Sequence, residues 1–147
     1  MRRLTATPAP DTLGQVSEEP GEDLVAFATR LFAMAREGDG ARLAAYVDAG
    51  VDANLANHNG DTFVMLAAYH GHADTVRALL ARGADPDRAN DRGQTPLAGA
   101  VFKGEDDVVD ALLDGGADPG AGTPSARATA EMFGRADLLE RFGPAAG

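Results

Sequence analysis

A step of 33 residues recurs through most of this 147-residue chain and constrains its fold more than any other feature. The positions that keep the step include glycines, aspartates and apolar residues, namely Gly38, Gly71 and Gly104; Gly50, Gly83 and Gly116; Gly60 and Gly93; Asp52, Asp85 and Asp118; and Val47, Leu80 and Leu113. A unit of this length is too short to bury an apolar face by itself. The repeat therefore predicts a row of stacked units in place of a single central core.

Helical periodicity and stop signals indicate two short helices in each unit. A first amphipathic helix is expected from Asp23, with its apolar face at Leu24, Phe27, Ala28, Leu31 and Ala35. In the third unit Thr95 can cap a helix that starts with Pro96, where a missing N–H costs nothing. Gly71 and Gly104 are expected to end such helices in the left-handed conformation.

The residues that carry the period resemble the ankyrin repeat. Residues 93–97 read GQTPL and residues 112–118 read LLDGGAD, similar to the opening and the close of that repeat, and residues 79–85 repeat the close. The resemblance covers about residues 24–142 and implies an all-α ankyrin-repeat solenoid of about four helix-turn-helix units with short hairpin loops. The expected organisation is a disordered tail at 1–22 and a repeat domain at 23–147, with units at about 24–57, 58–90, 91–121 and 122–147.

This sequence departs from the family pattern in two places. Met65 and Ala98 stand where the family has a histidine that holds the loop, so other groups are expected to hold the hairpins. Gly134 follows Gly104 by only 30 positions, so the last unit is short. Its second helix is expected at 136–142, as a terminal cap with an outer polar face at Arg135, Glu140 and Arg141.

Composition excludes several classes of protein. The chain has no cysteine, which rules out disulfides, thiolate zinc sites and a cysteine nucleophile. A formal charge of −10 argues against nucleic-acid or anionic-membrane binding, because both need clustered cations. The start of the chain lacks the apolar stretch of a signal peptide, and no apolar run approaches the ~18 residues of a membrane span. We expect a cytoplasmic monomer, and the excess of arginine over lysine favours a bacterial source.

Three patterns could carry chemistry, and each has a plainer interpretation. The histidines of His70-x-His72, with His58, could bind a metal, but a turn between helices accounts for them better. Asp106, Asp110 and Asp114 share a helical face, which indicates a solvated stripe more often than contact with a basic partner. The glycines of residues 115–122 lack the lysine and the strand of a phosphate-binding loop. We expect no enzyme activity and no cofactor.

The resemblance implies a binding surface made of the inner faces of the first helices and the hairpin tips. By position, the inner-face pairs are Arg36 and Glu37, Tyr69 and His70, Phe102 and Lys103, and Met132 and Phe133; the tip residues are His58, Asn59, Asp61, Asp91, Arg92 and Gln94. Aromatic side chains in one register suit an interface. Packing between repeats is the alternative for Phe102 and Met132. The expected function is binding of another protein; the alternative is a small-molecule or metal-binding accessory protein that uses His70 and His72.

Residues 1–22 have too few apolar residues to form a packing face. Deleting them should therefore leave the thermal unfolding of the repeat domain nearly unchanged. A melting curve of the shortened chain checks this, and a fall in Tm of more than a few degrees would show that the segment packs on the repeats.

Overall fold

The computed structural model describes residues 20–144, so residues 1–19 of the predicted tail lie outside the described part. Within that part there are eight helices and no strand. They are α1 Pro20–Glu37, α2 Gly40–Asp48, α3 Phe63–Tyr69, α4 Ala73–Leu80, α5 Pro96–Lys103, α6 Asp106–Asp114, α7 Ala126–Met132 and α8 Ala136–Phe142. None of them has the length and apolar character needed to cross a bilayer. The chain divides into two units, residues 1–31 and 32–147, and α1 contributes to both.

In the first unit, α1 begins at Pro20, earlier than the predicted start at Asp23. Proline suits the first helical position, because its N–H would be unsatisfied there in any case. The prediction that Leu24 belongs to a buried face is wrong, since Leu24 is 67% exposed. Leu31, at the end of this unit, is buried as predicted.

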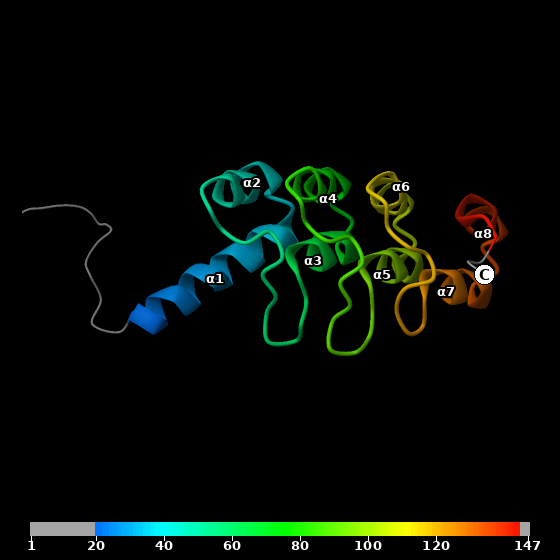
Figure 1. Ribbon diagram of the computed structural model, residues 1–147, viewed down its shortest axis with the longest axis horizontal. Coiled ribbons are helices and arrows are strands. Elements are labelled where there is room, and N and C mark those ends of the chain that lie inside the picture. The colour runs from blue at the N-terminus through cyan, green and yellow to red at the C-terminus, as the bar shows by residue number, and fades with distance from the viewer. Residues whose placement is uncertain (1–19, 145–147) are drawn as a thin grey trace, which may run out of the picture. The chain divides into compact units, whose positions relative to one another are not determined.

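In the second unit the helices form two rows (Figure 1). The inner row holds α3, α5 and α7, and the outer row holds α2, α4, α6 and α8. Successive inner helices pack on one another, and so do α2, α4 and α6. The hairpins that join the repeats extend away from the outer row. This is the ankyrin-type solenoid that the repeat predicts.

Caps and glycine turns explain where the inner helices begin and end. The hydroxyl of Thr95 accepts a hydrogen bond from the N–H of Ala98 at 3.2 Å, and Thr62 caps α3 in the same way. Gly104 closes α5 with φ at +73°, a conformation that glycine adopts without steric cost. The predicted roles of Thr95 and Gly104 are confirmed.

Small and branched apolar residues fill the space between neighbouring helices. The buried set in the inner row includes Phe63, Val64, Ala67, Leu97, Ala100, Ala126 and Ala130, and in the outer row Leu43, Val76, Leu79, Val108, Leu112 and Leu138. Alanines between the inner helices let their backbones approach closely, while leucines and valines fill the outer row. The core is therefore a strip that runs along the stack.

Aspartate and asparagine side chains bridge successive hairpins where the family histidine is absent. Asn54 Oδ1 accepts from the Asp85 N–H at 2.7 Å, and Asp87 Oδ1 accepts from the Asp118 N–H at 2.8 Å. These two bridges occupy equivalent places along the array and fix the spacing of the loops. The expectation that other groups hold the hairpins agrees with this geometry.

Salt bridges connect the outer helices of successive repeats. Arg135 pairs with Asp106 at 3.1 Å, and Arg141 pairs with Asp110, so these two arginines of the last repeat point toward α6. Asp114 pairs with Arg77 of α4 at 3.1 Å. The side chains of Asp106, Asp110 and Asp114 remain 61%, 46% and 65% exposed, so the interpretation as a solvated stripe agrees with the structure. What the sequence did not predict is that each of these aspartates also pairs with an arginine of a neighbouring repeat.

Leu79 and Leu112 occupy equivalent places in α4 and α6, at 1% and 0% exposure. Replacing either with alanine should lower the free energy of unfolding by ~2–5 kcal/mol, because a cavity is left in the stack. Chemical denaturation of each variant checks this. Asp107→Ala, an exposed position on α6, is the control and should cost less than ~1 kcal/mol; equal losses would contradict the assignment of faces.

Candidate functional site

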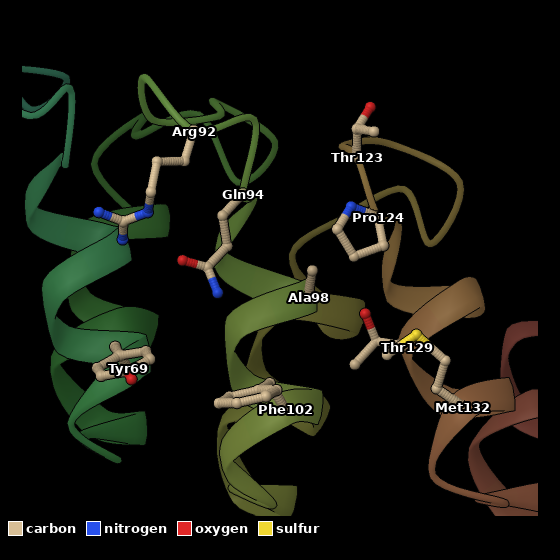
Figure 2. Close-up of a pocket in the computed structure, with 9 residues that line it drawn as sticks. All are labelled: Tyr69, Arg92, Gln94, Ala98, Phe102, Thr123, Pro124, Thr129 and Met132. Carbon is tan, nitrogen blue, oxygen red and sulfur yellow. The ribbon is translucent and has the colours of Figure 1, made fainter.

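A groove of about 370 Å³ lies on the inner row, across α3, α5 and α7. Figure 2 shows the side chains that line it, which come from these three helices and from the hairpins before α5 and α7. They are Tyr69, Arg92, Gln94, Ala98, Phe102, Thr123, Pro124, Thr129 and Met132. The large apolar side chains stand near the C-terminal ends of the helices, and Arg92, Gln94 and Thr123 stand at the hairpin end (Figure 2). The groove therefore has an apolar end and a polar end.

The apolar end consists of side chains that the fold leaves open to solvent. Phe102 is 54% exposed and Met132 67% exposed, while Tyr69 is half-buried. Phe102 also contacts Phe133 of the next repeat, with ring centroids 5.7 Å apart. Phe102 therefore both packs between repeats and contributes to the exposed surface, because one face of its ring touches the neighbouring repeat and the rest is accessible.

The polar end is held in place by Asn90, a buried residue of the hairpin before α5. Its Oδ1 accepts hydrogen bonds from the N–H groups of Arg92 and Gln94, both at 3.0 Å. Its Nδ2 donates to Asp61 Oδ1 of the preceding hairpin at 2.9 Å. The backbone that carries Arg92 and Gln94 is therefore fixed, and their side chains are directed into the groove from a rigid loop.

A smaller cavity of about 170 Å³ continues the groove toward α3. It shares Tyr69, Arg92 and Gln94 with the first, and its other lining residues are Asp61, Met65 and Leu66. Gly99 provides the space between α3 and α5 at this point. A Cβ atom on Gly99 would stand 3.1 Å from Met65 Cε and 3.6 Å from Tyr69 Cδ1, so a larger residue would press on both side chains.

The structure brings together only some of the residues predicted for the binding surface. Tyr69, Phe102, Met132, Arg92 and Gln94 line the main groove. Those predicted residues that do not line it are Arg36, Glu37, His58, Asn59, Asp61, Asp91, His70, Lys103 and Phe133. Of these, Asp61 lines the smaller cavity, and the others flank the groove or lie on exposed surface.

Sequence reasoning missed Ala98, Thr123, Pro124 and Thr129. Thr123 and Pro124 lie in the hairpin before α7, in the short last repeat. In the structure Ser125 caps α7 by accepting from the N–H of Ala128 at 3.0 Å, which leaves Thr123 and Pro124 on the groove wall. The sequence signal that could have located them is the 30-residue spacing of Gly104 and Gly134, which places the last repeat three positions earlier than the 33-residue step.

The histidines form no metal site in the part of the chain from residue 20 to residue 144. No group of three metal-binding side chains comes together there. The His72 Nε2–H donates to the carbonyl oxygen of Arg36 at 2.8 Å, an assignment that follows because the carbonyl can only accept. The His70 ring stands edge-on to Tyr69, with centroids 5.7 Å apart. These contacts give the metal-binding alternative no support.

Positive charge surrounds His70 at the edge of the groove. Partial burial lowers the pKa of His70, and repulsion from His72, Arg36 and Lys103 lowers it further. The Lys103 ammonium itself lies over the Tyr69 ring, 4.8 Å from its centroid. Cations placed over an aromatic face are attracted by its electron density. Lys103 therefore places positive charge beside the Tyr69 ring.

Comparison with known proteins gives consistent matches. The model of the family "Ankyrin repeats (3 copies)" matches residues 31–123. A curated ankyrin repeat protein of Pseudomonas aeruginosa is 53% identical over 51 residues, which is 35% of this chain and 30% of that protein. The solved human ASB11 ankyrin repeat domain is similar, with a TM-score of 0.57 and 31% identity, over 60% of this chain and 40% of that chain. The matches thus cover less than half the length of each of these two proteins.

The pKa of His70 should lie below the ordinary histidine value of 6.5. Lys103→Gln should raise it, because one repelling cation is removed, whereas Arg77→Gln on the outer row should not. A proton NMR titration of the imidazole measures all three. Because the pKa of His70 is lower in the folded chain than in the unfolded chain, the unfolded chain binds this proton at a higher pH. Acidification through 6.5 should therefore lower the free energy of unfolding. A midpoint above 6.5 in the NMR titration of His70 would contradict the described surroundings of this residue.

Proposed function

Because the chain belongs to the ankyrin repeat family, a non-enzymatic fold of protein–protein interaction modules, we propose that it binds a partner protein through the groove lined by Tyr69, Phe102 and Met132. The relative in Pseudomonas aeruginosa supports a bacterial source. Binding is noncovalent and involves no cofactor. The groove supplies the anchor points, and the hairpins supply the polar rim.

The observation that carries the proposal is the exposure of large apolar side chains in one register. Phe102, Met132 and Phe133 are all at least half exposed, and they are the exposed large apolar side chains among the described residues from 32 to 144. Covering one such side chain is worth about 1.5–3 kcal/mol. Contiguous exposed apolar surface is typical of an interaction site.

The groove is also preorganised for binding. Asn90 holds the polar wall, and the contact between Phe102 and Phe133 restricts the rings of the apolar wall. A partner that enters such a groove does not have to order the loops first, and this reduces the cost of association. The rigid stack thus serves recognition as well as stability.

Affinity purification with the tagged full chain from its native cells identifies the partner, and calorimetry on the purified pair tests the site. Tyr69→Ala should weaken binding by roughly 30-fold or more, since loss of an interface aromatic often costs ~2 kcal/mol or more. Phe102→Ala should have a similar effect.

Asp107→Ala on the outer row is the control and should bind like the unaltered chain. Melting curves of all variants separate loss of binding from loss of folding. Unfolding of both aromatic variants would show that the aromatic column is core. Unchanged affinity in both would mean that the partner uses another surface.

A further inference from the structure

We propose that the groove recognises an extended segment of its partner that carries an acidic side chain about three residues from a bulky apolar one. This inference rests on the proposed function and specifies the partner's chemistry. The acidic group is taken by Arg92 and the apolar group by the end at Tyr69, Phe102 and Met132.

The groove carries a single positive charge, on Arg92. Of the nine residues that line the main cavity, Arg92 is the charged one. The chain as a whole is strongly acidic, at −10, yet no carboxylate lines this cavity. A cationic partner group would meet Arg92 with no compensating acid, whereas a carboxylate can form a charge-assisted, bidentate pair.

Unlike the paired arginines of the outer row, the Arg92 guanidinium has no carboxylate partner among the described salt bridges. Arginines of the outer row are paired with aspartates, for example Arg77 with Asp114 and Arg82 with Asp48. Between residues 20 and 144, Arg92 makes no salt bridge, and only its backbone N–H is hydrogen-bonded there. The one carboxylate that lines the smaller cavity, Asp61, accepts a hydrogen bond from Asn90. Arg92 is therefore available to an anionic ligand.

Two further groups around the cavity fit the same ligand. The side-chain amide of Gln94, which makes no hydrogen bond within the described residues, offers one donor and one acceptor to a peptide backbone. Lys103, over the Tyr69 ring, adds positive charge at the other end. An extended segment of a protein offers backbone groups that hydrogen-bond to the Gln94 amide, and its negative charge is attracted by the cations Arg92 and Lys103.

The length of α5 fixes the spacing of the recognised groups. Gln94 and Phe102 stand at opposite ends of the groove. Phe102 lies six positions after Pro96, where α5 begins, which is about 9 Å along the helix at ~1.5 Å per residue, and Gln94 lies two positions before that helix. An extended peptide advances ~3.3 Å per residue. The reach of the Arg92 side chain shortens the span, so the acidic and apolar side chains of the ligand should stand about three residues apart.

The test selects peptides from a random 12-residue library displayed on phage, with the immobilised full chain as bait. The expected peptides carry Asp or Glu about three positions from Phe, Leu, Ile or Trp. One such peptide, made with a fluorescein label, is titrated against each variant by fluorescence anisotropy. Arg92→Ala should weaken it about 10-fold or more, as expected when a charge-assisted pair is lost.

Charge reversal makes the test specific. Arg92→Glu should reject the acidic peptide and should bind the matching peptide in which lysine replaces the acid. Arg42→Glu makes the same charge change at an exposed site on α2, away from the groove, and should leave both affinities unchanged. Melting curves of the Arg92 variants should match that of the unaltered chain, because the side chain supports no salt bridge in the described structure.

Other outcomes overturn the inference in distinguishable ways. Selection of neutral or basic peptides that still depend on Tyr69 would refute acidic recognition and leave the proposed function standing. Peptides insensitive to both Tyr69→Ala and Phe102→Ala would refute the groove as the binding site. Concentration-dependent self-association abolished by Phe102→Ala would show that a second copy of the chain occupies the groove.

Discussion

Each repeat of this protein stays folded because its neighbour covers its apolar face. Leu79 and Leu112 are fully buried only through contacts along the stack, since a helix pair of this size has no interior of its own. The same constraint explains the site. Residues on the inner row such as Phe102 and Met132 can pack on a neighbouring repeat with part of their surface, but no element of the described structure covers the rest. Stability and the exposed groove thus follow from one arrangement.

Charge is divided between the two rows. On the outer row, aspartates and arginines of successive helices pair across the repeats, as Asp110 does with Arg141 and Asp48 with Arg82. Exposed pairs of this kind contribute little stability each, but they neutralise the face that carries them. On the inner row, Arg92 and Lys103 have no carboxylate partner in a salt bridge within residues 20–144. A protein with a large negative charge therefore presents positive charge where a ligand would bind.

The architecture could be predicted from the sequence, whereas only part of the groove could. The period, the cap at Thr95 and the helix at 136–142 could be predicted because glycine turns and capping residues act locally. The pairing of Arg135 with Asp106 could not, because it depends on which way a long side chain turns between two helices. The groove wall at Thr123 and Pro124 was missed for a related reason. Its place depends on where the shortened last hairpin lies in space, which local patterns do not report.

Methionine methyl NMR shows whether the exposed inner row contacts the partner. Met132 lines the groove and is 67% exposed, whereas Met34 is buried outside it. With the methionine methyl groups carbon-13 labelled, addition of saturating partner should shift or broaden the Met132 signal and leave the Met34 signal in place. An unchanged Met132 signal while the partner is bound would show that the partner does not bind in the groove.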